Sequence, residues 1–246
     1  MRTLKIVVEY DGAGYHGWQR QKGLLTVQQA LEESISRITG EKVTVVGSGR
    51  TDAGVHALNQ VAHFKTGSSL APRNLLLGIN SLLPLDVVVK ELQDVDELFH
   101  ARFDVKSKLY MYQIFNAPFR SALYRNYAWH VYASLNLIKM EEGLSFLKGA
   151  HDFSSFCGKK KDDEFNCIRD IKDARIEKTN LELIRIYMEA NGFLRYMVRT
   201  IAGALVDVGM GKRAPEDIPL ILDAKDRTKA GIKAPPQGLF LMEVKY

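Results

Sequence analysis

The segment from residue 47 to residue 56 carries the residue types with the clearest chemical potential in this chain. It reads GSGRTDAGVH, so three glycines surround Arg50 and Asp52. Glycine permits tight turns and close approach of the backbone to a ligand, and a carboxylate held in such a loop can act as a nucleophile or a general base. The same pattern also fits a plain turn in which Asp52 caps nearby amides. It is not a dinucleotide-binding fingerprint, because no helix follows at once and the third glycine is misplaced.

Two further cations, Arg195 and Arg199, lie one helical turn apart in an expected helix over residues 193–209. The apolar residues of this helix recur at i, i+3, i+4 and i+7, which defines a separate core-facing stripe. Like charges at i,i+4 repel by about 0.2–0.5 kcal/mol, so we expect at least one arginine to meet an anion. The alternative is a pair of surface arginines whose stems cover apolar surface while their heads reach water.

Aromatic and apolar residues at three positions could either line a ligand pocket or pack in the core. Tyr110 and Tyr112 alternate with apolar neighbours and therefore share one face of an expected strand. Stacking on a nucleic-acid base is one function of such a ring, and core packing is the other; core packing is the interpretation kept for Tyr112. Leu241 is first a core leucine and second an apolar pocket wall. The histidines show no metal-ligand spacing, and of these His56 and His151 are the two expected near a cleft.

The elements that must position these residues follow a repeated order. Strand and helix periodicities predict β-α-β-β-α-β in the first part of the chain, the order of a ferredoxin-like unit, and the same order again in the second part. A capping box formed by Thr26 and Gln29 is expected to open the first helix, and Gly40 to end it. The expected strands are 4–10, 42–47, 57–65, 86–93, 107–115, 169–178, 181–190 and 238–245, and the expected helices 26–39, 72–82, 135–148, 193–209 and 215–223.

The fold class is therefore α+β, with two similar ferredoxin/RRM-like halves. Residues 1–105 carry the Asp52 loop, and residues 106–246 carry Tyr110 and the arginine helix. We expect the halves to pair edge to edge into one extended, mostly antiparallel sheet with helices and a central cleft.

Composition limits the class of protein. The 246 residues are 46% apolar and 26% charged, with a net charge of +5, which permits a polyanionic partner without requiring one. No apolar run approaches the roughly 18 residues of a membrane span, and the first residues read as a strand rather than a signal peptide, so a cytoplasmic location is expected. The two cysteines are expected to be free thiols. The lysines at 159–161 and acids at 162–164 form either a solvated loop or a loop that contacts RNA phosphates.

The chain resembles the TruA family of tRNA pseudouridine synthases over nearly its whole length. The motif GRTDAGVHA at 49–57, followed by Gln60, is long and specific. One departure is Tyr196, where many members carry histidine. The other matching segments are YDGAGYHGWQRQ at 10–21, SKLYMY at 107–112, GAHDFSSF at 149–156, FLRYMVR at 193–199 and PPQGLFL at 235–241.

The resemblance implies conversion of uridine to pseudouridine in the anticodon stem-loop of tRNA, at positions 38, 39 and 40, by a homodimer without cofactor or metal. It makes Asp52 the catalytic carboxylate, and it leaves open whether this carboxylate attacks C6 of uracil, attacks C1′ of ribose or acts as a base. The cleft of the expected sheet then binds RNA. The resemblance also implies that Arg50 assists flipping of the target base and that Tyr110 contacts the flipped uridine. Arg199 is expected to pair with Asp52, and Leu241 to form a wall of the uracil pocket. The expected tRNA contacts are Lys108, Arg195 and His56.

The chemistry of the residues is compatible with these roles. Cleavage of a glycosidic bond leaves electron deficiency at C1′, which a carboxylate can stabilise or trap. A base inside a stem must be extruded before it can react, at a cost of about a few kcal/mol. A catalytically silent RNA-binding module and a small-molecule enzyme on a duplicated fold are the two rival hypotheses.

Overall fold

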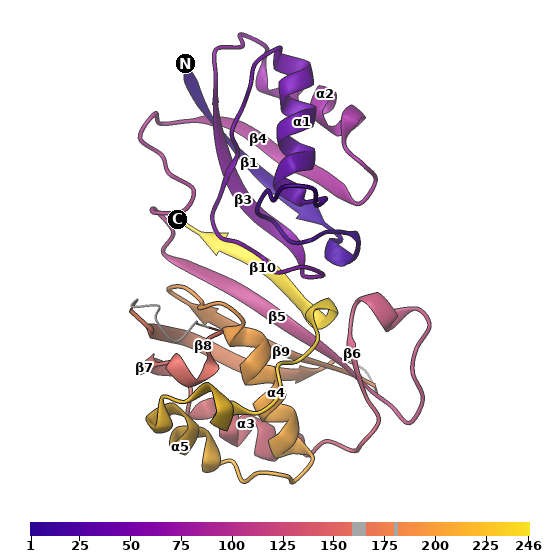
Figure 1. The fold of residues 1–246 in the computed structure, drawn as a ribbon, viewed down its shortest axis with the longest axis vertical. Coiled ribbons are helices and arrows are strands. Elements are labelled where there is room, and N and C mark those ends of the chain that lie inside the picture. Colours follow the sequence, from indigo (N-terminus) through magenta and orange to yellow (C-terminus); the bar gives the residue numbers. More distant parts are fainter. Residues whose placement is uncertain (159–165, 180–181) are drawn as a thin grey trace. The chain divides into compact units, whose positions relative to one another are not determined.

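The computed structural model of this protein describes residues 1–158, 166–179 and 182–246 (Figure 1). The lysine-rich and acidic run at 159–164 lies outside the described residues. Two compact units are present: unit 1 comprises Met1–Lys106 and Phe240–Tyr246, and unit 2 comprises Ser107–Leu239. Among the described residues, no helix has both the length and the apolar character needed to cross a membrane.

Unit 1 is built in the predicted order β-α-β-β-α-β. Its strands follow the spatial order β4-β1-β3, with the short β2 also on β3, and all of these pairings are antiparallel. Helices α1 and α2 pack against each other, and α2 lies along β4. The elements are β1 (Arg2–Tyr10), α1 (Val27–Thr39), β2 (Val46–Gly47), β3 (His56–Thr66), α2 (Pro72–Leu82) and β4 (Val87–Val95).

The last strand of the chain, β10 (Leu239–Lys245), completes the sheet of unit 1. Its residues Phe240 and Leu241 pair in parallel with His56 and Ala57 at the start of β3, and Figure 1 shows the yellow β10 beside the purple β3. The sequence pattern assigned this strand to residues 106–246. In the structure, residues 240–246 are instead part of unit 1.

The core of unit 1 follows directly from the periodicity of its elements. Alternate residues of β1, namely Leu4, Ile6 and Val8, are fully buried, as expected for a strand with one face toward a core. Helix α1 buries the stripe that contains Leu31 and Ile35. Together these faces remove the apolar side chains of the strand and the helix from water, which stabilises the unit by about 25 cal/mol per Å² buried.

The ends of α1 agree with prediction at one end only. Gly40 ends the helix in the left-handed conformation, with φ of 72°, as predicted. The predicted capping box is wrong, because the Thr26 side chain makes no capping hydrogen bond. The backbone carbonyls of Gly17 and Trp18 instead accept from the amides of Val27 and Gln28, at 3.2 and 3.0 Å. The preceding segment of chain therefore takes over the capping function.

Unit 2 contains an antiparallel sheet in the order β5-β9-β8-β7, with β6 pairing in parallel with β5. Helix α3 packs against α4 and β8, while α4 also contacts β5. Fully buried apolar residues such as Ile186, Met188 and Leu205 form the core between the helices and the sheet. The elements are β5 (Ser107–Asn116), β6 (Trp129–Val131), α3 (Leu137–Ser145), β7 (Gly149–Asp152), β8 (Ile168–Lys178), β9 (Leu183–Ala190), α4 (Met197–Gly209) and α5 (Asp217–Ala224).

The predicted α+β class, with mostly antiparallel strand pairing, is confirmed. Two predicted elements need correction, and two strands were missed. The strand expected at 42–47 is reduced to Val46–Gly47, and the helix expected from 193 begins at Met197 because Tyr196 adopts a left-handed conformation with φ of 66°. The short strands β6 and β7 were not predicted, since three- and four-residue strands carry too little periodicity to detect.

Candidate active site

The loop that carries Asp52 connects β2 to β3 in unit 1 and contains a tight turn. The amide of Val55 donates to the carbonyl of Asp52 at 3.2 Å, and Gly54, the third residue of this turn, has φ of 77°. A positive φ is strained for residues with a side chain, so glycine is the natural residue there. Asp52 itself is half-buried.

Segment 10–18 of the same unit is hydrogen-bonded to this loop. The amide of Trp18 donates to the Thr51 carbonyl at 3.1 Å, and the amide of Gly54 donates to the Tyr15 carbonyl at 3.3 Å. Backbone bonds therefore attach the loop on both sides of Asp52. Such attachment limits the conformations of the catalytic candidate before any substrate binds.

A buried hydroxyl pair gives a third attachment point. The Tyr10 hydroxyl lies 2.8 Å from the Thr51 hydroxyl, in a buried setting. Burial raises the pKa of Tyr10 to about 12, against smaller opposing effects of hydrogen bonds from Thr51 and Gln60. The phenol is therefore neutral near pH 7 and acts as a fixed hydrogen-bonding group beside the residue that precedes Asp52.

Close approach of the two segments requires glycine. A Cβ atom added to Gly17, whose φ is +90°, would lie 2.6 Å from the Thr51 carbonyl oxygen, and one added to Gly12 would collide with the Val55 carbonyl. The tyrosine- and glycine-rich motif at 10–21 therefore forms the supporting wall of the Asp52 loop. The role of this motif is structural, and the sequence alone did not indicate that role.

Arg50 is exposed at the surface of unit 1, and a chain of polar side chains leads from it to helix α1. Its Nε donates to Gln19 Oε1 at 2.9 Å, Gln19 Nε2 donates to Gln28 Oε1 at 2.6 Å, and Gln28 Nε2 donates to Glu32 Oε1 at 2.8 Å. Gln28 and Glu32 are each only 6% exposed. The arginine head is thus oriented by a buried network on the helix.

Gln28 and Glu32 are functional candidates that sequence reasoning missed. Both are polar residues spaced i,i+4 beside the apolar stripe of α1, which was a usable signal, because polar groups next to a core face are buried only with hydrogen-bond partners. Glu32 also accepts from the Val45 amide at 3.1 Å and from Arg20 at 2.8 Å. The pair therefore connects the helix, the segment around Arg20 and the strand before the Asp52 loop.

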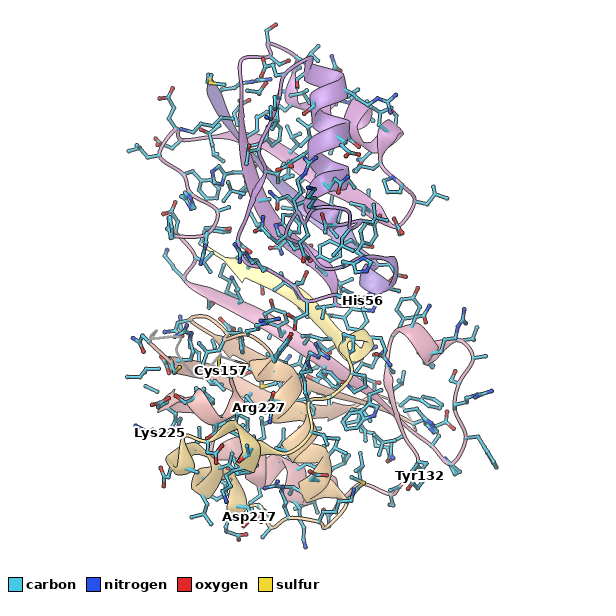
Figure 2. The ribbon with its side chains drawn as sticks, in the orientation of Figure 1. His56, Tyr132, Cys157, Asp217, Lys225 and Arg227 are labelled. Atoms are coloured by element: carbon cyan, nitrogen blue, oxygen red, sulfur yellow. The ribbon has the colours of Figure 1, made fainter. Side chains whose placement is uncertain are left out.

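His56 and Leu241 lie at the pairing of β3 with β10. His56, labelled in Figure 2, is 2% exposed and stacks on Phe240 with 4.7 Å between ring centroids. Its Nδ1 lies 3.0 Å from both the Gly12 amide and the Asp11 carboxylate, and these contacts require different tautomers: Nδ1 accepts from the first and donates to the second. Leu241 is 1% exposed. Both residues therefore lie where the Asp52 loop enters β3.

In unit 2, Tyr110 and Lys108 lie on β5. Tyr110 is 8% exposed and meets Phe193 edge to face, with ring centroids 5.0 Å apart. Lys108 is half-buried. Tyr112 is fully buried, and its hydroxyl donates to the Pro235 carbonyl at 2.8 Å, so the prediction that Tyr112 packs in the core is confirmed.

The two arginines of the predicted helix have different environments. Arg199, in the first turn of α4, is 6% exposed, and its Nε donates to the Ala234 carbonyl at 2.8 Å. The alternative in which both arginines lie on the surface is therefore wrong for Arg199. Arg195 precedes the helix, is exposed, and donates from Nη2 to the Tyr196 hydroxyl at 2.7 Å.

The predicted site residues thus fall into two groups. Unit 1 holds Asp52, Arg50, His56 and Leu241, and unit 2 holds Lys108, Tyr110, Arg195 and Arg199. The two cysteines, Cys157 and Cys167, are buried and are not joined in a disulfide, as predicted.

Comparison with known proteins defines the class. A family model described as tRNA pseudouridine synthase matches residues 6–104 and 145–246. The chain is 49% identical over 248 residues to tRNA pseudouridine synthase A of Thermoanaerobacter sp. (strain X514). It is 46% identical over 246 residues to the protein of the same name from Caldicellulosiruptor saccharolyticus, and 43% identical over 246 residues to that of Acetivibrio thermocellus. Each alignment covers 100% of both chains.

The chain belongs to the tRNA pseudouridine synthase family. It is accordingly an isomerase that acts on uridine in tRNA.

Proposed function

We propose that this enzyme converts uridine to pseudouridine in the anticodon stem-loop of tRNA, at positions 38, 39 and 40, with Asp52 as its catalytic carboxylate. The observation that carries the proposal is the support of the Asp52 loop. Trp18, Tyr15 and Tyr10 each bond to the loop from segment 10–18, while Asp52 stays half-exposed. A carboxylate held in this way is preorganised for chemistry, whereas a simple turn needs no such support.

The reaction has a simple balance of bonds. The bond between uracil N1 and ribose C1′ breaks, the uracil turns, and a bond forms between its C5 and C1′. The C5 hydrogen leaves as a proton, and N1 gains a proton. The carboxylate of Asp52 serves either as the nucleophile, at C6 or at C1′, or as the base that assists the detachment of the uracil.

The remaining residues have supporting roles in this proposal. Arg50, oriented through Gln19, assists extrusion of the target base from the stem. Tyr110 offers its ring to the flipped uridine, since base stacking on an aromatic ring is worth about 1–3 kcal/mol. Arg199 pairs with the Asp52 carboxylate and orients it, and Leu241 contributes an apolar wall to the pocket.

The family resemblance also supports the wider setting of the reaction. The enzyme works as a homodimer in the cytoplasm, with one subunit positioning tRNA for the other, and it requires no cofactor or metal. Lys108, Arg195 and His56 complete the tRNA contacts in this scheme. Because His56 is buried, its contribution is through the loop that it supports rather than through direct contact.

Tritium release tests the proposal. The substrate is tRNA transcribed with uridine labelled at C5, because C5 loses its hydrogen only when the base is rejoined through that carbon. We expect release by the wild type and none by Asp52→Asn, with tRNA affinity retained by the variant. Arg199→Lys should release tritium more slowly, since lysine lacks the forked donor geometry of arginine.

Two outcomes would contradict the proposal. Normal release by Asp52→Asn would remove Asp52 from the chemistry. Salt-sensitive tRNA binding without release by the wild type would favour a silent RNA-binding protein. Mapping of the modified positions in the product tRNA checks the assignment to positions 38, 39 and 40 independently.

A further inference from the structure

The ring of Tyr196 in unit 2 is surrounded by positive charge. The Lys233 Nζ lies 3.7 Å from the ring centroid, the Arg195 guanidinium carbon 4.6 Å and the Arg199 guanidinium carbon 5.5 Å. Arg195 and Lys233 are exposed, while Arg199 is buried beneath them. Cations favour the face of an aromatic ring, but three positive charges around one ring also repel each other.

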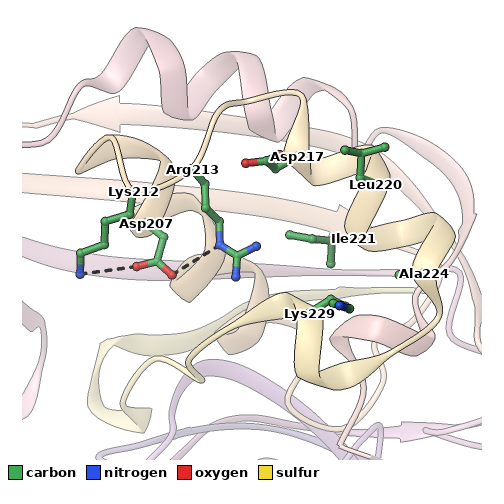
Figure 3. A pocket seen from close by; sticks show the side chains of 8 residues that line it. All are labelled: Asp207, Lys212, Arg213, Asp217, Leu220, Ile221, Ala224 and Lys229. Atoms are coloured by element: carbon green, nitrogen blue, oxygen red, sulfur yellow. Dashed lines mark ion pairs between the residues drawn. The ribbon is translucent and has the colours of Figure 1, made fainter.

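Among residues 1–158, 166–179 and 182–246, the two exposed cations at Tyr196 have no carboxylate partner. Within the part of the chain that the structure describes, Arg195 and Lys233 form no ion pair with an acidic side chain. The open cavity of about 680 Å³ near α5 provides the contrast. There Asp207 lies 3.9 Å from the Lys212 ammonium and 3.8 Å from the Arg213 guanidinium (Figure 3). Lys212 and Arg213 thus share a carboxylate, whereas no described acidic side chain pairs with Arg195 or Lys233.

The backbone at Tyr196 is strained and fixed. Its φ of 66° is a left-handed conformation, which costs about 1–2 kcal/mol in a residue with a side chain. Gly158 fits against the ring so tightly that a Cβ atom there would overlap it, and the Gly158 amide donates to the Arg195 carbonyl at 2.9 Å. Strain of this kind persists where surrounding structure enforces it, commonly at ligand sites.

The arrangement also offers several hydrogen-bond donors. The Tyr196 hydroxyl accepts from Arg195, so its own proton can be donated outward. Tyr196 is the residue before α4, a helix of 13 residues, and its side chain makes no capping hydrogen bond to that helix. The N-terminal end of a helix carries partial positive charge and attracts anions such as phosphate. The guanidinium and ammonium groups therefore lie around the ring of the residue that precedes a helix N-terminus.

We propose that Arg195, Lys233 and the Tyr196 hydroxyl form a binding site for a backbone phosphate of tRNA. The inference rests on the proposed function, in which this enzyme binds a tRNA stem-loop. It adds Lys233 and Tyr196 to the residues that contact the tRNA. Phosphate is the fitting ligand because it bears negative charge and several acceptor oxygens, which match a forked guanidinium, an ammonium and a hydroxyl. The tyrosine thus organises two cations and donates a hydrogen bond itself.

The test is the salt dependence of tRNA binding, measured with proteins that all carry Asp52→Asn so that the RNA is not consumed. Loss of one phosphate contact lowers the slope of log Kd against log salt by about 0.7–0.9. We expect Lys233→Gln to lower the slope by this amount and to raise Kd several-fold at low salt. Lys139→Gln, which removes the same charge from an exposed position on α3, should leave the slope unchanged.

Tyr196→Phe separates the two roles of the tyrosine. It keeps the ring that gathers the cations and removes the hydroxyl, so we expect a higher Kd with an unchanged slope. If Lys233→Gln and Lys139→Gln show the same slope as the parent, the cluster only stabilises the fold and the inference is wrong. If Lys233→Gln changes affinity for inorganic phosphate but leaves the tRNA slope intact, the site serves a free phosphate and the RNA assignment is overturned.

Failure of this inference is distinguishable from failure of the proposed function. Tritium release by the wild type reports on the reaction alone and does not depend on which residues hold the phosphate. Normal release together with an unaltered slope in Lys233→Gln would discard the phosphate site and leave the catalytic proposal intact.

Discussion

Among single residues, Gly17 in the segment that supports the Asp52 loop combines a positive φ with a close backbone contact. Its φ of +90° disfavours any side chain, and a Cβ atom would lie 2.6 Å from the Thr51 carbonyl oxygen. We expect Gly17→Ala to lower the free energy of unfolding by about 3 kcal/mol, from backbone strain together with the clash. We also expect it to reduce tritium release at least tenfold, because relief of the clash displaces Thr51 and Asp52.

Gly23→Ala is the matched control for this prediction. Gly23 has φ of +74°, but nothing lies within 4 Å of an added Cβ atom. The strain alone should cost about 1 kcal/mol and leave turnover near the wild-type rate. Urea unfolding and tritium release on both variants make the comparison. Equal losses in the two variants would show that the contact with Thr51 is unimportant.

His63 gives unit 1 a predictable response to pH. Burial is the largest cause that lowers its pKa below the ordinary value, and the nearby charges of His100 and Lys65 lower it further, against an opposing effect of Asp104. Its Nδ1 also accepts from the Ala101 amide at 3.1 Å, which only a ring unprotonated at that atom can do. The folded state therefore favours the neutral imidazole.

The sign of the effect follows from proton linkage. As pH falls through about 6.5, the ordinary histidine value, the unfolded chain binds a proton at His63 while the folded chain does not. The free energy of unfolding should therefore fall between that pH and the lower pKa of the folded state. Urea midpoints from pH 7.5 to 5 should show a steeper fall for the wild type than for His63→Gln. Parallel curves would contradict the prediction.

At the scale of elements, helix α1 does more than cover the sheet. Its buried Glu32 accepts hydrogen bonds from Gln28, Val45 and Arg20, so a single carboxylate ties the helix to two other segments. We expect Glu32→Gln to lower the free energy of unfolding by about 1–3 kcal/mol, because an amide places donors where acceptors are needed. The Gln28–Gln19 contact that orients Arg50 should loosen with it.

Glu33→Gln on the same helix is the control. Glu33 is exposed and accepts a hydrogen bond only on the surface, from Gln29 at 2.8 Å, so its loss should cost less than about 0.5 kcal/mol. Thermal unfolding of the two variants, followed by their tritium release, separates a buried network from a surface contact. Similar stability in both variants would contradict the network.

The elements also show which kinds of structure can be predicted from sequence. Long periodic segments such as β1 and α2 were found within two residues of their ends. Thr26 makes no capping hydrogen bond, and the carbonyls of Gly17 and Trp18 accept from the first two amides of the helix instead. The late start of α4 at Met197 depends on the packing of Gly158 against Tyr196. Both differences arise from contacts between segments distant in sequence, which local propensity does not contain.

For the candidate site, the sequence indicated the residues that carry chemical groups but not the residues that support them. Motif resemblance proposed Asp52, Arg50, Tyr110 and Arg199 as site residues, and these assignments stay predictions. It did not indicate that the motif at 10–21 supports the Asp52 loop, that Gln28 and Glu32 orient Arg50, or that Lys233 gathers at Tyr196. Such support depends on tertiary packing, since Gln19 and Arg50 are 31 residues apart, and residues in supporting roles have no chemical signature of their own.

For the whole molecule, the relevant quantity is the electrostatic contribution to RNA binding. The net charge of +5 is modest, so a strong salt dependence would require cations placed at the RNA rather than a generally basic surface. At least four phosphate contacts, from residues such as Arg50, Lys108, Arg195 and Lys233, correspond to a log–log slope of about 3, at roughly 0.7–0.9 per contact. We expect this slope for tRNA with the Asp52→Asn enzyme.

The same salt titration with an isolated anticodon stem-loop shows which part of the tRNA provides the phosphate contacts. If the enzyme contacts only that stem-loop, the slopes for the fragment and the complete tRNA should agree; a steeper slope for the complete tRNA would indicate additional contacts on the rest of the molecule. A slope near zero for both RNAs would contradict recognition through phosphates altogether. Affinity would then have to arise from base stacking and hydrogen bonding, and Tyr110 would become the residue whose substitution weakens binding most.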